Sequence, residues 1–199
     1  MLVATIAIQG LLASFPRRTL LTGGTAAALF RMDASANAAE LKVGGAIVYG
    51  DDSIMSPKSH GTTDAPVQTN LRWGVDRDTA DRICCFNRHY AEYAGYWKKT
   101  NFLTEVKDGE TTYYDSVSGK PLFVAPRGRS FDAFVKESAS HGWPSFRDEE
   151  VVWENMRVLK NGEAISVDGT HLGHNLPDRN GNRYCINLVS VAGLPQEAA

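Results

Sequence analysis

The feature that most limits the fold is a series of short β-type runs in the second half of the chain, separated by glycine-containing turns. Six runs rich in β-branched and aromatic residues follow Asn101, at 111–114, 122–124, 151–153, 157–159, 164–167 and 184–191. Asp-Gly, Ser-Gly, Asn-Gly and Asp-Gly pairs lie before or after individual runs and begin at 108, 118, 161 and 168. Such pairs favour tight turns between antiparallel strands. We therefore expect a compact, mainly β domain.

The part of the chain before these runs has the composition of an arm followed by a short helix. Residues 39–72 are rich in Gly, Ser, Thr, Asp and Pro, which is typical of an extended arm or a long loop. Asp76 or Asp78 can then cap a helix that continues to about Glu92, because apolar residues recur there at helical spacing. This short helical region would carry two adjacent cysteines.

The N-terminal segment has the pattern of a targeting signal. The first 32 residues contain no Asp or Glu, and the Arg17-Arg18 pair precedes a short apolar run at 20–30 and two A-x-A-like sites. We expect residues 1–38 to direct export or import, to a plastid, a thylakoid lumen or a bacterial periplasm. An ordinary apolar N-terminal helix is the alternative. Neither apolar run beside the arginines reaches the roughly 18 residues that span a bilayer, so no stable membrane anchor is expected.

Charge and cysteine content exclude several classes of function. Lys and Arg number 21 against 23 Asp and Glu, a net charge of -2, so no general attraction to nucleic acid is expected. The three cysteines are too few for a dense disulfide framework. No two of them have the two-residue spacing of a zinc knuckle, so we expect no cysteine-built metal site.

Cys185 is the cysteine placed in a β-type run with a basic neighbour. A thiol with the ordinary pKa of roughly 8.5 is only a few per cent ionised at neutral pH, and a nearby cation increases that fraction. Arg183 can supply the cation, because residues two apart lie on the same face of a strand. The alternative is a buried, inert cysteine, which the local pattern alone favours.

His171 and His174 form a His-Leu-Gly-His motif that can bring two imidazoles to one small site. Imidazole exchanges protons near neutral pH, so such a pair beside a thiolate suits acid-base assisted sulfur chemistry. Two alternatives remain open: a metal site completed by Asp168 or Asp178, and ordinary hydrogen bonds in a loop.

Two further motifs offer an aromatic surface and additional thiols. Trp143 lies in a Gly-Trp-Pro-Ser-Phe segment, and its indole could hold a methyl or thioether group, although such a residue is more often part of a core. Cys84 and Cys85 are adjacent, which disfavours a bond between them, but either could pair with a third thiol.

Four motifs occur together in one order: Tyr-Asp-Ser-Val-Ser-Gly-Lys-Pro-Leu-Phe (114–123), Gly-Trp-Pro-Ser-Phe (142–146), His-Leu-Gly-His (171–174) and Arg-Tyr-Cys-Ile-Asn (183–187). In this order and approximate spacing they resemble the B-type methionine-R-sulfoxide reductases. The resemblance extends over about residues 76–193. It implies a catalytic domain at 73–194, followed by a tail at 195–199, with two antiparallel sheets in the arrangement called a β-tent.

The resemblance also implies roles for individual residues. Cys185 would be the nucleophile, with His171, His174 and Asn187 around the sulfoxide. The residues expected to bind substrate are Trp143, against the methyl group, and Phe146, Asp178 and Arg183.

Three departures from the family pattern modify this expectation. Zinc-containing members carry two Cys-x-x-Cys pairs, and the matching positions here are Asp115, Ser118, Ile165 and Asp168, so the chain resembles the zinc-free branch. His141 stands where some zinc-free members have a resolving cysteine. The segment after Asn187 also differs from the small hydroxyl residues usual in the family.

The sequence therefore predicts a monomeric, metal-free enzyme that reduces methionine-R-sulfoxide, mainly in oxidised proteins or peptides. Cys185 would become a sulfenic acid, and a second thiol, Cys84 or Cys85, would condense with it to a disulfide. Thioredoxin or a similar external dithiol would then restore the thiols. The alternatives are a β domain that binds oxidised or apolar peptides without turnover, and a metal-binding module built on His171 and His174.

Overall fold

The structure is a computed structural model that describes residues 41–106 and 109–196. The expected targeting segment, residues 1–38, lies outside this part of the chain. Among the described residues, every helix is too short or too polar to cross a bilayer.

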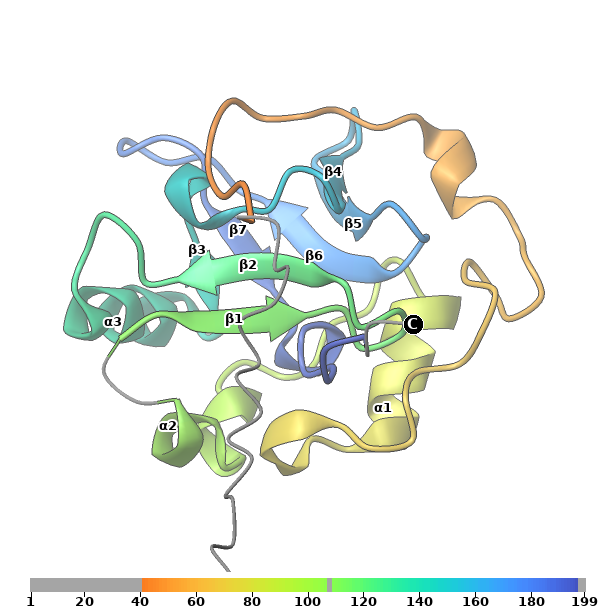
Figure 1. Ribbon diagram of the computed structural model, residues 1–199, viewed down its shortest axis with the longest axis horizontal. Helices are drawn as coiled ribbons and strands as arrows, with labels where there is room; N and C mark the ends of the chain where they lie inside the picture. Colours follow the sequence, from red (N-terminus) through yellow and green to blue (C-terminus); the bar gives the residue numbers. More distant parts are fainter. Residues whose placement is uncertain (1–40, 107–108, 197–199) are drawn as a thin grey trace, which may run out of the picture. The chain divides into compact units, whose positions relative to one another are not determined.

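Two antiparallel sheets form the domain, which confirms the expected mainly β architecture (Figure 1). The smaller sheet pairs β1 (Thr111–Tyr114) with β2 (Pro121–Ala125). The larger sheet has the strand order β3-β7-β6-β5-β4. Its strands are β3 (Ser145–Phe146), β4 (Met156–Val158), β5 (Glu163–Ser166), β6 (His171–Asn175) and β7 (Tyr184–Ile186).

Helical segments are short and surround the sheets. The α-helices are α1 (Arg77–Asp81), α2 (Phe102–Glu105) and α3 (Phe131–His141), and α1 continues into a π-helical segment, η3 (Arg82–Phe86). The 3-10 segments are η1 (Asp52–Met55), η2 (Arg72–Gly74), η4 (Tyr96–Lys99), η5 (Asp148–Glu150) and η6 (Leu188–Ser190).

The helix expected to reach about Glu92 is shorter. Asp76 caps it as predicted, because its carboxylate accepts a hydrogen bond from the Thr79 amide at 2.8 Å. The helical conformation ends at Phe86, since Asn87 has φ -141° and ψ 89°. The following segment, 87–95, is instead held against the sheet by its own polar contacts.

Two predicted strands also differ. The run 151–153 makes only an isolated bridge, in which Val151 faces Phe123 of β2. The run 184–191 ends as a strand at Ile186 and turns into η6, where the carboxylate of Glu92 accepts hydrogen bonds from the Leu188 and Val189 amides.

Aromatic packing joins the two sheets and α3. Phe146 on β3 stacks on Phe123 of β2 with ring centroids 4.2 Å apart, and it also contacts Tyr113 on β1 and Phe134 on α3. All four rings are fully buried. Phe146, expected at the substrate, is therefore placed in the centre of the core.

The Asp115 carboxylate, at one of the positions where the motif resemblance would place a zinc ligand, is buried. Asp115 accepts hydrogen bonds from the Val117 amide and from the hydroxyl groups of Ser118 and Thr170 at 2.8–3.1 Å. Thr170 lies just before β6, so these bonds tie the β1–β2 turn to the larger sheet. At a second such position, Asp168 pairs with Lys120 at 2.9 Å.

Phe146→Ala should lower the free energy of unfolding by about 3–5 kcal/mol, because it leaves a cavity where the two sheets meet. Equilibrium unfolding in urea measures this loss. Phe131→Ala, on the partly buried side of α3, is the control and should cost much less. A loss below about 1 kcal/mol for Phe146→Ala would contradict its central role in packing.

Candidate active site

A cavity of about 310 Å³ collects most of the residues that the motifs single out. It lies between β6, β7, the Trp143 loop and the segment 87–95. Its lining residues are His89, Tyr90, Ala91, Trp143, His171, Gly173, His174, Leu176, Cys185 and Asn187. The structure thus brings five predicted residues together: Cys185, His171, His174, Asn187 and Trp143.

A β-bulge places both histidines of the His-Leu-Gly-His motif on this cavity. Residues three apart in a regular strand point to opposite faces. Here Gly173 faces Ala164, while His171 faces Ile165, so Leu172 is an extra residue in β6. Such a bulge re-aims the side chains beyond it. His171 and His174 consequently both line the cavity, with ring centroids 5.7 Å apart.

Strand register sets the nucleophile candidate opposite one of these histidines. Cys185 on β7 pairs with His174 on β6, so the two side chains lie on the same face of the sheet. Gly173 permits the close pairing, because a Cβ atom there would lie 2.1 Å from the Cys185 carbonyl oxygen. Cys185 is partly exposed, whereas the other two thiols are buried.

Opposing effects act on the Cys185 thiol. Burial raises its pKa above the ordinary value, and the positive charge of the Arg183 guanidinium reduces this rise without cancelling it. Arg183 itself is buried, with 7% of its surface exposed. Its Nε and Nη1 atoms have no hydrogen-bond partner among the described residues. A buried cation with free donors stabilises a neighbouring thiolate.

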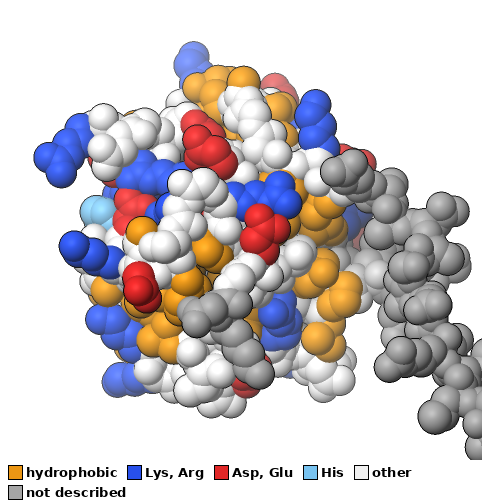
Figure 2. All heavy atoms as spheres, turned by 60° about the vertical axis from the view of Figure 1, so that its left-hand side comes forward, with side chains coloured by type: hydrophobic (Ala, Val, Ile, Leu, Met, Phe, Trp, Pro, Cys, Tyr) orange, Lys and Arg blue, Asp and Glu red, His pale blue; other side chains and the backbone are white. Residues whose placement is uncertain are grey.

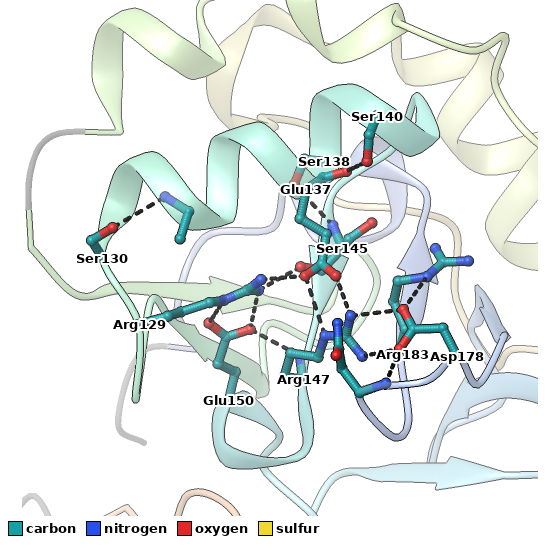
Figure 3. A network of polar contacts seen from close by, with 12 residues as sticks. Arg129, Ser130, Glu137, Ser138, Ser140, Ser145, Arg147, Glu150, Asp178 and Arg183 are labelled. Atoms are coloured by element: carbon teal, nitrogen blue, oxygen red, sulfur yellow. Dashed lines mark hydrogen bonds and ion pairs between the residues drawn. The ribbon is translucent and has the colours of Figure 1, made fainter.

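A network of ion pairs includes Arg183 (Figure 3). Asp178 lies 3.7 Å from the Arg183 Nε atom and 2.8 Å from Arg147, which also pairs with Glu137 on α3. The hydrogen bonds from Arg147 lower the pKa of Asp178 to about 2, so this carboxylate remains ionised. Asp178 borders a separate cleft of about 760 Å³ with Arg147 and Glu137, and it is absent from the lining of the Cys185 cavity.

His171 is held by a buried carboxylate that the motifs did not reveal. Its Nδ1 atom lies 2.8 Å from Oε1 of Glu163, and both side chains are at most 2% exposed. Arg88 donates three hydrogen bonds to the same carboxylate at 2.7–3.2 Å. Burial alone would raise the pKa of Glu163, but the contacts with His171 and Arg88 lower it.

The ionised Glu163 can only accept hydrogen bonds, so the Nδ1 atom of His171 must carry a hydrogen. The Nε2 atom of His171 is then the one left for the cavity. His174 has a different environment. Burial lowers its pKa, and the nearby His171 lowers it further. The two imidazoles are therefore electrostatically unequal.

Asn187 and Trp143 are fixed by Glu92, another residue that the sequence did not single out. The Asn187 amide donates to the Leu172 carbonyl at 3.1 Å and accepts from the Glu92 backbone amide at 3.3 Å. The Trp143 indole donates to the Glu92 carbonyl at 3.0 Å. Glu92 thus connects the segment 87–95 to Asn187 and η6, which follow β7, and to the tryptophan loop.

The structure does not bring Cys84 or Cys85 to the cavity. Both are buried in the core beside α1, and neither is among the residues that line the site. Cys84 contacts the Ser190 hydroxyl at 3.5 Å, and burial raises its pKa well above the ordinary value. Burial also raises the pKa of Cys85 to about 12.

Two groups of side chains could hold a metal ion within the described part of the chain, and both lie outside the cavity. They are His60 with Asp81 and Cys85, and Glu137 with His141 and Asp178. Neither group contains His171 or His174, which were the proposed basis of a metal-binding module.

Figure 2 shows that Lys and Arg side chains alternate with acidic ones on the face it presents, so this face has no uniform charge.

The pH dependence of stability should reveal the buried carboxyl group of Glu92. Burial raises its pKa from 4.5 to about 7. The stabilising contribution of a group whose pKa is raised is complete below about pH 4.5 and is lost as the pH rises through about 7. We expect wild type to lose about 3 kcal/mol of unfolding free energy from this group over that range.

Urea unfolding at several pH values, with Glu92→Gln as the comparison, measures this contribution. The variant cannot titrate at this position, so the difference in stability between the two proteins should change across the range. A difference that stays constant from pH 4.5 to 8 would contradict the assignment.

No protein-family model matches the chain, and no solved structure matches it. The likeness to a known family therefore rests on the four sequence motifs. The chemical interpretation rests on the side chains that the fold gathers around Cys185.

Proposed function

We propose that this protein reduces methionine-R-sulfoxide, in oxidised proteins or peptides, to methionine. One observation carries the proposal: a partly exposed Cys185 shares a cavity with His171, His174 and the Trp143 indole, while the charge of the buried Arg183 offsets part of the rise in the Cys185 pKa. The cavity combines a nucleophile, proton-exchanging groups and an apolar surface. Selection of the R epimer rests on the motif resemblance alone.

In the proposed reaction the Cys185 thiolate attacks the sulfur of the sulfoxide. This attack forms a bond between the Cys185 sulfur and the substrate sulfur while a proton is supplied to the oxygen. The hydroxyl group then moves to the Cys185 sulfur as the sulfur–oxygen and sulfur–sulfur bonds of the adduct break, which leaves the thioether and a Cys185 sulfenic acid. The sulfoxide is reduced by two electrons to a thioether, and the cysteine is oxidised by two. Trp143 would pack against the methyl group of the substrate.

His171 is the better proton donor of the two imidazoles. The Glu163 carboxylate fixes hydrogen on Nδ1, so Nε2 is the atom that exchanges a proton with the cavity, and the facing negative charge compensates charge that develops on the ring during the transfer. The lowered pKa of His174 favours its neutral form. His174 would therefore orient the sulfoxide or a water molecule.

Recycling would use an external dithiol directly. One thiol of a thioredoxin-like reductant attacks the Cys185 sulfenic acid and releases water, and the second thiol then breaks the mixed disulfide. This route fits the structure better than an internal disulfide, because Cys84 and Cys85 are buried, carry raised pKa values and do not line the cavity.

Turnover of separate R and S epimers of a methionine sulfoxide peptide, with dithiothreitol as reductant, tests the function. We expect reduction of the R epimer and loss of activity to background in Cys185→Ser, because a hydroxyl group is not ionised at neutral pH. A tenth or more of wild-type activity in Cys185→Ser would show that the nucleophile is misassigned. Folded protein that reduces neither epimer would favour a peptide-binding domain without catalysis.

Glu163→Gln should lower kcat by about 10- to 100-fold with little change in KM, because the amide still accepts a hydrogen bond but no longer stabilises charge on His171. Steady-state kinetics on the R epimer measures the effect. Glu149→Gln, at an exposed position, is the matched control. Equal kinetics for the two variants would remove Glu163 from the proton-donating unit.

Replacing Cys84 and Cys85 together by Ser distinguishes the two routes of recycling. Direct reduction predicts that the double variant, if folded, keeps thioredoxin-supported turnover near the wild-type rate. Retention of a single turnover without cycling would instead identify one of these cysteines as the resolving thiol. Mass spectrometry of the substrate-treated wild type would then show a disulfide to Cys185.

A further inference from the structure

Three side chains of different chemistry meet outside the lining of the Cys185 cavity: His60 from the arm, and Asp81 and Cys85 from the α1–η3 helical segment. Each offers one ligand atom, and these atoms all lie within 4.8 Å of one another. We propose that His60, Asp81 and Cys85 form a binding site for a divalent transition-metal ion of the zinc class. The proposal is independent of the function assigned to Cys185.

Two of the separations between the three side chains are close to those around a tetrahedral ion. Zinc binds nitrogen and oxygen at about 2.0 Å and sulfur at about 2.3 Å, which gives ligand–ligand separations of about 3.3 Å and 3.5 Å. The His60 Nε2 atom lies 2.9 Å from Asp81 Oδ2, and the Cys85 sulfur lies 3.7 Å from Asp81 Oδ1. The third pair, His60 Nε2 and Cys85 Sγ, lies within 4.8 Å, so these two atoms would approach each other by up to about 1.3 Å to hold the ion.

The backbone holds the three residues in place without a metal. Asp81 and Cys85 are four residues apart in a helical segment and therefore project from one face. His60 lies in a tight turn that packs on the same segment, because the Thr62 amide donates to the Cys85 carbonyl at 2.8 Å. Gly61 makes this approach possible, since a Cβ atom there would lie 2.0 Å from that carbonyl oxygen.

Neighbouring groups orient the side chains of Asp81 and His60, as residues that contact metal ligands do in known metal sites. The Val67 amide donates to Asp81 Oδ1 at 3.0 Å, which leaves Oδ2 for an ion. The His60 ring packs edge-on against Phe86 with centroids 4.6 Å apart. His60 and Asp81 side chains are 28% and 21% exposed, so an ion and a solvent ligand can reach them.

The donor set favours zinc or cobalt over magnesium or calcium. Thiolate and imidazole are soft or intermediate ligands, and hard cations prefer oxygen donors alone. Binding would release one proton, because the free Cys85 thiol is protonated at neutral pH. The second candidate group is less suitable, since Arg147 already pairs with both of its carboxylates, Glu137 and Asp178.

Cobalt titration of the full-length Cys185→Ser protein tests the proposal, because Cys84 and Cys85 are then the only thiols present. With a phosphine reductant present to keep the thiols reduced, one equivalent of Co²⁺ should produce a thiolate-to-cobalt charge-transfer band. Addition of Zn²⁺ should abolish this band. Adding Cys85→Ser should remove the band, while adding Cys84→Ser, the adjacent buried control, should retain it.

His60→Asn keeps both thiols and alters a partly exposed side chain, so it decides the question even if Cys85→Ser fails to fold. Loss of a residue that only supports a metal ligand weakens metal binding by roughly 10- to 100-fold, so loss of a ligand should weaken Co²⁺ binding by at least that factor. His141→Asn, in the other group, should bind as the parent does. A parent protein without the band, a band that survives Cys85→Ser, or unchanged affinity in His60→Asn would overturn the proposal.

Discussion

The β-bulge at Leu172 is the constraint on which the candidate site depends. A regular strand would direct His171 and His174 to opposite faces, and only one of them could share a cavity with Cys185. The extra residue would leave unpaired backbone groups, but the Leu172 carbonyl accepts hydrogen bonds from both the backbone and the side-chain amide of Asn187. The bulge and Asn187 therefore form one structural unit, which explains why a polar residue follows the cysteine strand.

Two sets of buried charge approach the cavity with opposite sign. Glu163, backed by Arg88, brings negative charge to His171, whereas Arg183, backed by Asp178, brings positive charge to Cys185. Burying a charge is costly unless it is paired, and each set supplies the pairing at a distance from the reacting atoms. The positive charge near sulfur offsets part of the rise that burial causes in the pKa of Cys185, and the Glu163 carboxylate fixes the orientation of the His171 ring.

The sequence predicted the parts of the fold that local chemistry determines. The glycine turns and β-branched runs located β1 and β2 well, and the motifs located Cys185 and both histidines. α3 was missed because its sequence is mostly polar and only Phe134 and Ser138 are buried. β6 was missed because a glycine between two histidines has the composition of a loop. Contacts that the fold creates, such as that of Glu163 with His171, leave no local sequence pattern. The role of Glu92 likewise depends on Leu188 and Val189, which lie 96 and 97 positions later in the chain and return to it in the fold.

The cavity has two kinds of wall, and the difference bears on how such a site can diversify. Cys185 and the two histidines belong to paired strands, where a change of register would move several side chains at once. His89, Tyr90 and Ala91 come from the segment 87–95, outside both sheets, in which His89 and Tyr90 are exposed. Substitutions in that segment can alter the shape of the entrance while the strands keep their alignment. Under the proposed function, substrate range and chemical competence would be encoded in separate stretches of sequence and could evolve independently.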